Sequence, residues 1–266
     1  MLAKQRQAVI LEEVRRRGGV RVSDLTELLQ VSDMTIRRDL DVLAGRGLVD
    51  KVHGGATAVT ERSTHEPGFE AKSLREQAEK EAIADLAATL VRPGNAVGLT
   101  AGTTTWTLAK RLTELPGLTV VTNSIQVAEV FYQSDGAEQT VVLTGGLHTP
   151  SDALVGPVAV ASIRALNLDL LFMGVHGMDA RAGFSTPNLM EAETDRVMAR
   201  AARRVAVVAD HTKWGTIGLS SILALDEADV LVTDELLDAE ARRVLAENVG
   251  ELLVAPLGAP RAAAER

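Results

Sequence analysis

Two adjacent arginines, Arg37 and Arg38, lie in a short segment that also carries small hydroxyl side chains. The planar fork of an arginine bonds guanine edges in the major groove or backbone phosphates. Ser32 and Thr35, a few residues earlier, are short enough to contact a phosphate. This combination indicates a nucleic-acid-binding surface; the alternative from spacing alone is the solvated face of an ordinary helix.

The arginine pair needs a helix that turns it towards solvent. Ile36, Leu40 and Leu43 recur with the spacing of one helical face, which predicts a helix over residues 32–44 with that face buried. Ser32 is its expected N-cap. The side chains left on the other faces are Met34, Thr35, Arg37 and Arg38.

A shorter helix over residues 22–30 is expected before it, with Ser23 as N-cap and Leu25 in its buried face. Two short helices joined by a tight turn form a helix-turn-helix, whose second helix reads the major groove. Residues 48–58 alternate apolar and polar side chains around two glycines, which predicts a small β-hairpin or wing.

A second group of small polar residues follows four candidate strands in the rest of the chain. These strand-end turns contain Gly102, Thr103 and Thr104, then Asn123 and Ser124, then Gly145 and Gly146, and finally Gly174 and Gly177. Backbone N–H groups and hydroxyls at a helix N-terminus bind anions, although one such turn alone is as often a plain cap. Four of them at one edge of a parallel sheet predict a ligand crevice.

The pattern behind these turns is an alternation of short apolar runs and helical stretches. The expected strands are 95–100, 118–122, 140–144, 169–175, 205–210, 229–233 and 251–255, and the expected helices are 76–91, 103–115, 124–133, 158–166, 189–203 and 238–248. The alternation predicts an α/β domain with a mainly parallel sheet.

Lys213 follows one of these strands and could pair with a phosphate as a point charge; the alternative is a surface lysine. Glu191 heads a predicted helix, where an acid is favourable without any ligand. The chain has no cysteine, and its histidines lack the spacing of metal ligands, so we expect neither a metal site nor a cofactor.

Charge is distributed unevenly along an acidic chain with net charge −8. Residues 1–56 contain ten Lys or Arg and eight Asp or Glu, whereas the remaining residues contain 18 and 28. Any DNA contact is therefore expected in the N-terminal segment. Because no apolar run approaches the roughly 20 residues of a membrane span and no signal peptide is apparent, we expect a soluble cytoplasmic protein.

One continuous string is more specific than the helical pattern. Val31-Ser32-Asp33-Met34-Thr35-Ile36-Arg37-Arg38-Asp39-Leu40, followed by His53-Gly54-Gly55-Ala56, closely resembles the DeoR family of bacterial transcriptional regulators. The resemblance implies that residues 32–44 are the recognition helix and residues 49–56 the wing, with Lys51 and His53 facing DNA. Lys51 stands where many relatives have an arginine. It keeps the positive charge but lacks the two parallel N–H donors of a guanidinium.

The resemblance continues over about residues 75–255, through the strand-end turns and Asp210–Gly215. It implies a sensor domain similar to ribose-5-phosphate isomerase, which in the family typically binds a phosphorylated sugar or polyol. Two positions depart from the family pattern. Thr100 replaces an acid, and Asp195 stands where many relatives have a lysine.

We therefore expect a winged helix-turn-helix over residues 1–58, a linker over 59–75, an α/β effector-binding and oligomerisation domain over 76–257 and a flexible tail over 258–266. The expected function is a DNA-binding regulator, in the first instance a repressor of a carbohydrate operon that a sugar phosphate or polyol relieves. Paired half-sites imply a homo-oligomer, either dimer or tetramer.

Two other classes of function stay open at this point. One is a sugar-phosphate isomerase with an appended DNA-binding domain; Thr100 argues against it because isomerisation needs a positioned base. The other is a structural or interaction module, against which the strand-end glycines and hydroxyls argue.

Overall fold

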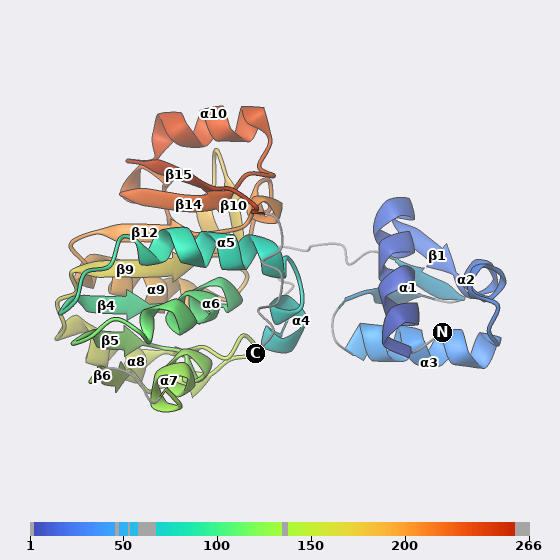
Figure 1. The fold of residues 1–266 in the computed structure, drawn as a ribbon, viewed down its shortest axis with the longest axis horizontal. Coiled ribbons are helices and arrows are strands. Elements are labelled where there is room, and N and C mark those ends of the chain that lie inside the picture. Colours follow the sequence, from blue (N-terminus) through green and yellow to red (C-terminus); the bar gives the residue numbers. More distant parts are fainter. Residues whose placement is uncertain (1–2, 46–47, 53, 58–67, 135–137, 259–266) are drawn as a thin grey trace. The chain divides into compact units, whose positions relative to one another are not determined.

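The computed structural model of the chain describes residues 3–45, 48–52, 54–57, 68–134 and 138–258 (Figure 1). The chain forms two compact units, one of residues 1–62 with 70–72 and one of residues 63–69 with 73–266. Three parts of the predicted organisation lie outside the described residues, namely His53 of the wing, residues 59–67 of the linker and residues 259–266 of the tail.

The N-terminal unit packs helices on a small sheet. Its elements are α1 (Ala3–Arg17), β1 (Gly19–Arg21), α2 (Val22–Leu29), α3 (Asp33–Gly45), β2 (Asp50–Val52) and β3 (Gly55–Thr57). Ile10 of α1, Leu25 of α2 and Ile36 of α3 are buried together in one core. The tight turn between α2 and α3 passes through Gln30, whose backbone is left-handed at φ 53°. The predicted helix-turn-helix is thus confirmed.

The sheet of this unit has one strand that the sequence did not predict. β1 pairs with β3, which also pairs with β2, and all pairs are antiparallel. A Cβ atom on Gly55 would lie 2.1 Å from the carbonyl oxygen of Val20, so only glycine lets β3 approach β1. The second glycine of the His-Gly-Gly-Ala string is therefore a packing requirement.

Of the two predicted N-caps in this unit, one is confirmed. The Thr35 amide donates to Ser32 Oγ over 3.3 Å at the start of α3. The prediction for Ser23 is wrong, because β1 runs directly into α2 and Arg21 takes the cap position. Ser23 lies inside the first turn, where its hydroxyl donates to Asp24.

The second unit is built on a parallel sheet. Its strands are β4 (Ala96–Leu99), β5 (Thr119–Thr122), β6 (Thr140–Leu143), β9 (Leu170–Gly174), β12 (Val205–Val208), β14 (Val230–Asp234) and β15 (Leu252–Ala255). They lie in the order β15-β14-β12-β9-β4-β5-β6, and every pair is parallel (Figure 1). All seven predicted strands are present, so their carboxyl ends share one edge.

Helices cover both faces of this sheet. They are α5 (Gln77–Ala88), α6 (Thr103–Leu112), α7 (Ile125–Tyr132), α8 (Pro157–Arg164), α9 (Leu189–Ala201) and α10 (Ala239–Asn248). α5, α6 and α7 pack in one core with Phe172 and Val208, whereas α8, α9 and α10 pack in another with Leu171 and Val207. One further helix, α4 (Phe69–Ser73), lies within the predicted linker, where no helix was expected.

Short elements that the sequence did not predict complete the unit. They are the hairpin β7 (Leu147–His148) and β8 (Leu154–Val155), the antiparallel sheet of β10 (Gly177–Asp179), β11 (Gly183–Thr186) and β13 (Ser220–Leu223), and the 3-10 turns η1 (His211–Lys213) and η2 (Leu225–Glu227). No helix in the described part of the chain could cross a membrane. Within the same residues, no group of His, Asp and Glu could hold a metal ion.

Candidate DNA interface and effector site

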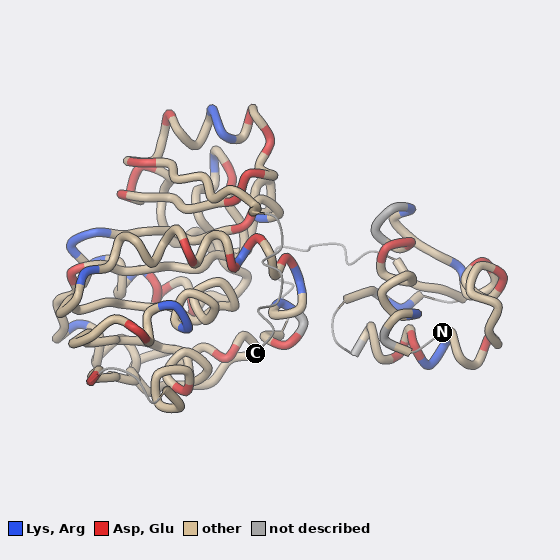
Figure 2. Tube along the Cα trace, in the orientation of Figure 1, with Lys and Arg blue, Asp and Glu red and all other residues tan. Residues whose placement is uncertain are grey.

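Helix α3 turns its apolar face inward and its charged face outward. Leu40 and Leu43 are buried with Ile36, whereas Arg37 and Arg38 are exposed. Met34 is 74% exposed, which is unusual for a methionine unless a partner covers it. Acidic and basic residues are interspersed along this helix (Figure 2). Met34, Arg37 and Arg38 are thus exposed as the sequence predicted, and Thr35 is half-buried.

Two of the predicted DNA-contacting cations are paired with acids of the same unit. Arg37 Nε donates to Asp33 Oδ1, and its Nη2 lies 3.4 Å from Asp33 Oδ2. This pairing raises the pKa of Arg37 and lowers that of Asp33. Lys51 of β2 is paired in the same way with Asp41. Arg38 is exposed and makes no hydrogen bond or ion pair within the described residues.

The aspartate that follows the arginine pair holds the recognition helix in place. Asp39 is 3% exposed and accepts hydrogen bonds from Arg6 Nε and from Gln7 Nε2, the latter at 3.0 Å. The hydrogen bond to Asp39 raises the pKa of Arg6. These bonds tie α1 to α3, so the aspartate in the Arg-Arg-Asp-Leu string is a structural residue.

In the second unit, hydrogen bonds join three neighbouring strand ends. Asn123 Oδ1, after β5, accepts from the Ala101 amide after β4 at 2.8 Å. Thr100 Oγ1 accepts from the Gly174 amide at the end of β9 at 3.0 Å. Thr100 is fully buried, so the residue that replaces the family's acid is a brace between strands and offers no base.

Hydrogen-bond donors without a partner among the described residues lie at the same edge of the sheet. Asn123 is 1% exposed, yet its Nδ2 has no hydrogen-bond acceptor among the described residues. The hydroxyls of Thr103 and Thr104 make no hydrogen bond there either, and both residues open helix α6. A buried amide without a partner costs free energy unless water or a ligand accepts from it. This is the donor arrangement expected of an anion or polyhydroxy site.

The other predicted residues of this edge shape it. Ser124 is fully buried and caps α7, because Val127 N donates to its Oγ at 3.2 Å. Gly145 and Gly146 both have positive φ. A Cβ on Gly146 would lie 2.5 Å from the carbonyl oxygen of Val155, so the loop packs closely over β8.

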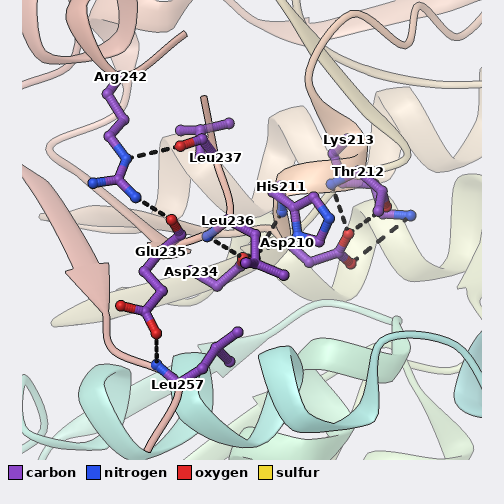
Figure 3. Close-up of polar contacts among 10 residues, drawn as sticks. All are labelled: Asp210, His211, Thr212, Lys213, Asp234, Glu235, Leu236, Leu237, Arg242 and Leu257. Carbon is purple, nitrogen blue, oxygen red and sulfur yellow. Dashed lines mark hydrogen bonds and ion pairs between the residues drawn. The ribbon is translucent and has the colours of Figure 1, made fainter. Parts of the chain in front are cut away.

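A charged cluster that sequence reasoning missed in part lies at the end of β12. Lys213 Nζ is 4.0 Å from Asp210 Oδ2, an oxygen that is buried and accepts no hydrogen bond among the described residues (Figure 3). Lys80 of α5 is 4% exposed, and its Nζ donates to the Arg75 carbonyl oxygen. Burial lowers the pKa of Lys80 to about 8. The positive charges of Lys213 and Arg75 also lower it, whereas Asp210 and Glu76 raise it.

Asp234 holds the turn that carries Lys213 through contacts with His211 of the same turn (Figure 3). Asp234 is fully buried; it accepts from the His211 amide at 2.8 Å and lies 2.9 Å from His211 Nδ1. Burial raises the pKa of Asp210, but Lys213, the Thr212 hydroxyl and Lys80 outweigh it, so the pKa of Asp210 is lowered. The charges of Lys213 and Lys80 thus both favour the ionised form of Asp210.

Glu191, the other acid that the sequence singled out, connects the loop between β7 and β8 with the end of β11. It accepts from Thr149 Oγ1 at 2.7 Å and from Thr186 Oγ1 at 3.2 Å. Asp195, one turn further along α9, is buried; burial and the Glu191 carboxylate raise its pKa well above the ordinary value. The departure at Asp195 therefore places a buried carboxyl beside Glu191 in this helix.

The fold and the two sites define a class of protein, a helix-turn-helix regulator with an α/β sensor domain. Residues 6–62 match the DeoR-like helix-turn-helix domain, and residues 75–235 match the DeoR C-terminal sensor domain. The chain therefore belongs to the DeoR family and is a DNA-binding transcriptional regulator.

Curated relatives match nearly end to end. An uncharacterised HTH-type transcriptional regulator YgbI of Escherichia coli K12 is 38% identical over 96% of this chain and 99% of its own length. The regulator GlpR of Haloferax volcanii is 37% identical over 96% and 98%. A putative aga operon transcriptional repressor of Escherichia coli O157:H7 is 34% identical over 89% and 88%.

Proposed function

We propose that this regulator is a cytoplasmic repressor of a carbohydrate-metabolism operon, and that a sugar phosphate at the strand-end edge of its sensor domain relieves repression. The observation that carries the effector part is the pair of lysines around Asp210, together with the unpaired Nδ2 of Asn123. Lysines supply point charges for a phosphate, while amide and hydroxyl donors suit sugar oxygens. A relative that is described as an operon repressor supports the repressor part.

The proposed effector contacts extend the set predicted from sequence by one residue. Lys80 joins Gly102, Thr103, Thr104, Asn123, Gly145, Gly146 and Lys213. Ser124 contributes through the helix that it caps, since its hydroxyl is already used. An isomerase activity is not part of the proposal, because Thr100 replaces the acid that could act as base and its hydroxyl braces Gly174.

The proposed DNA contacts are the exposed side chains of α3 with the wing. Ser32, Met34, Thr35, Arg37 and Arg38 lie on α3 or at its start, and Lys51 lies on β2. Two copies of the chain would place two recognition helices on paired half-sites, so the proposal includes a homo-oligomer, dimer or tetramer.

A contact within the predicted linker supports coupling between effector and DNA. Phe69, at the start of α4, packs edge-on against Trp106 with ring centroids 5.6 Å apart and planes at 85°. Trp106 lies one turn into α6, the helix that Thr103 and Thr104 open. An effector that shifts α6 would therefore reach α4, the helix that lies within the predicted linker. Such coupling requires that the effector bind one conformation more tightly than the other.

Calorimetry with paired ligands tests the effector class. The full chain is titrated with ribose 5-phosphate and ribose, glucose 6-phosphate and glucose, and glycerol 3-phosphate and glycerol. We expect at least one phosphorylated compound to bind more than about tenfold tighter than its free partner, because the free compound offers no charge to the lysines. Binding of free compounds alone would overturn the phosphate assignment and leave the DNA-binding role standing.

A further inference from the structure

The two arginines of the recognition helix differ in how they are held. Arg37 is gripped at its Nε and Nη2 edge by both oxygens of Asp33, whereas Arg38 has no partner among the described residues. Asp33 and Arg37 stand four residues apart with the acid on the N-terminal side, which is the favourable order on a helix. Arg37 is therefore pre-ordered along α3, whereas no described residue holds Arg38 in one position.

A guanidinium held in this way still has its other edge to offer. Asp33 occupies Nε and one N–H of Nη2, which leaves both N–H groups of Nη1 and the second of Nη2. Two parallel N–H donors from Nη1 and Nη2 match O6 and N7 of guanine. Arg37 can thus read a guanine without releasing Asp33, and less side-chain freedom is lost on binding.

The same carboxylate opposes contacts that carry no sequence information. Asp33 stands at the first position of α3, near where a recognition helix meets the DNA backbone, and its negative charge repels phosphates. Arg37 and Asp33 together are neutral, so the pair gains little from non-specific phosphate attraction. Among the charged groups that face Arg37, Asp41 is the only other one whose charge alters its pKa within the described part of the chain.

We propose that Asp33 is a specificity-determining residue, which holds Arg37 as a guanine reader and lowers affinity for DNA without the operator sequence. This inference rests on the proposed DNA interface. It separates the arginine pair into a base reader, Arg37, and a mobile phosphate contact, Arg38.

The test compares two duplexes by fluorescence anisotropy with the full chain. One duplex is selected from a random pool by the wild-type protein, and the other is its scrambled sequence. Asp33→Asn keeps the side-chain shape and removes the charge. We expect it to bind the selected duplex about two- to tenfold more weakly and the scrambled duplex about two- to fivefold more tightly, so the specificity ratio falls.

A matched control uses the second acid–base pair of the unit. Asp41→Asn frees Lys51, a point charge, and should raise affinity for both duplexes by the same factor. In an Arg37→Ala background, Asp33→Asn should no longer lower the specificity ratio, because the guanine reader is gone. Circular dichroism checks that each variant is folded.

If Asp33→Asn raised the affinity for both duplexes by the same factor, as is expected of Asp41→Asn, this inference would be wrong, whereas the proposed DNA interface would be unaffected. If Arg37→Ala and Arg38→Ala both bound the selected duplex as tightly as wild type, the proposed DNA interface would be wrong, and this inference would be wrong with it. We expect Arg37→Ala to weaken binding of the selected duplex. We expect Arg38→Ala to weaken binding of both duplexes alike and to reduce the dependence of its DNA affinity on salt concentration.

Discussion

Replacing Lys80 by glutamine is expected to remove most of the affinity for a phosphorylated effector while DNA binding is retained. Lys80 is buried, and Lys213 and Asp210 both act on its charge. Truncating one partner of a desolvated charge pair costs about 2–3 kcal/mol, or roughly 30- to 150-fold in Kd. Calorimetry with the phosphorylated sugar that wild type binds measures this loss.

The matched control is a lysine of the same unit outside the charged cluster. Lys110 of α6 lies over the Trp106 ring, 3.2 Å from its centroid, and Lys110→Gln should leave the effector affinity unchanged. Equal losses for the two variants would show that total charge, and no built site, attracts the ligand.

The pKa of Lys80 gives the same prediction a pH dependence. With a pKa of about 8, the fraction of charged Lys80 falls from about nine-tenths at pH 7 to about a tenth at pH 9. The second pKa of a phosphate monoester is about 6, so the phosphate is predominantly a dianion throughout this range. Effector affinity should therefore fall about tenfold between pH 7 and 9 in wild type and stay flat in Lys80→Gln. A flat wild-type profile would contradict the assignment of Lys80.

The second large effect concerns the fold of the DNA-binding unit. Gly55→Ala should lower its free energy of unfolding by about 3 kcal/mol or more, because the new Cβ would meet the Val20 carbonyl oxygen at 2.1 Å and the Arg21 Cα at 3.1 Å. Both neighbours are backbone atoms of β1, which cannot move aside without breaking the β1–β3 pairing. Chemical denaturation followed by circular dichroism measures the change.

The adjacent glycine is the control for this prediction. Gly54 has φ +81°, and a Cβ added to it would meet no heavy atom of the described residues within 4 Å. Gly54→Ala therefore carries only the cost of a left-handed alanine, about 1 kcal/mol. If Gly54→Ala destabilised the protein as much as Gly55→Ala, the close approach of β3 to β1 would not be what requires glycine.

The strands of the parallel sheet were predictable from the sequence, whereas most of the short strands of the small antiparallel sheets were not. The parallel strands carry short apolar runs, and nearly every residue of the inner strands β9, β12 and β14 is buried, as in a sheet that is covered on both faces. β1, by contrast, has only three residues, the first of them Gly19, and its partner β3 begins at Gly55. Its pairing is a tertiary contact that no local pattern indicates, and for the same reason the N-cap of α2 was wrongly predicted at Ser23.

The candidate site was predictable where residues follow strands and unpredictable where they come from a helix. Asn123 comes directly after β5, and Lys213 lies in the turn that follows β12; topology alone brings such turns to one edge. Lys80 precedes the first strand of the sheet. Its signal was a lysine within the buried stripe of Ile83, Ala84 and Ala87, a position where an unpaired charge is costly.

Coupling between the strand-end edge and DNA can be observed in a single displacement titration. The full chain is bound to its selected, fluorescently labelled duplex, and the phosphorylated sugar identified by calorimetry is added at pH 7. We predict release of the duplex at ligand concentrations near the calorimetric Kd, with no release in Lys80→Gln or by the free sugar. A complex that stays intact when the sensor site is saturated would contradict the proposed coupling.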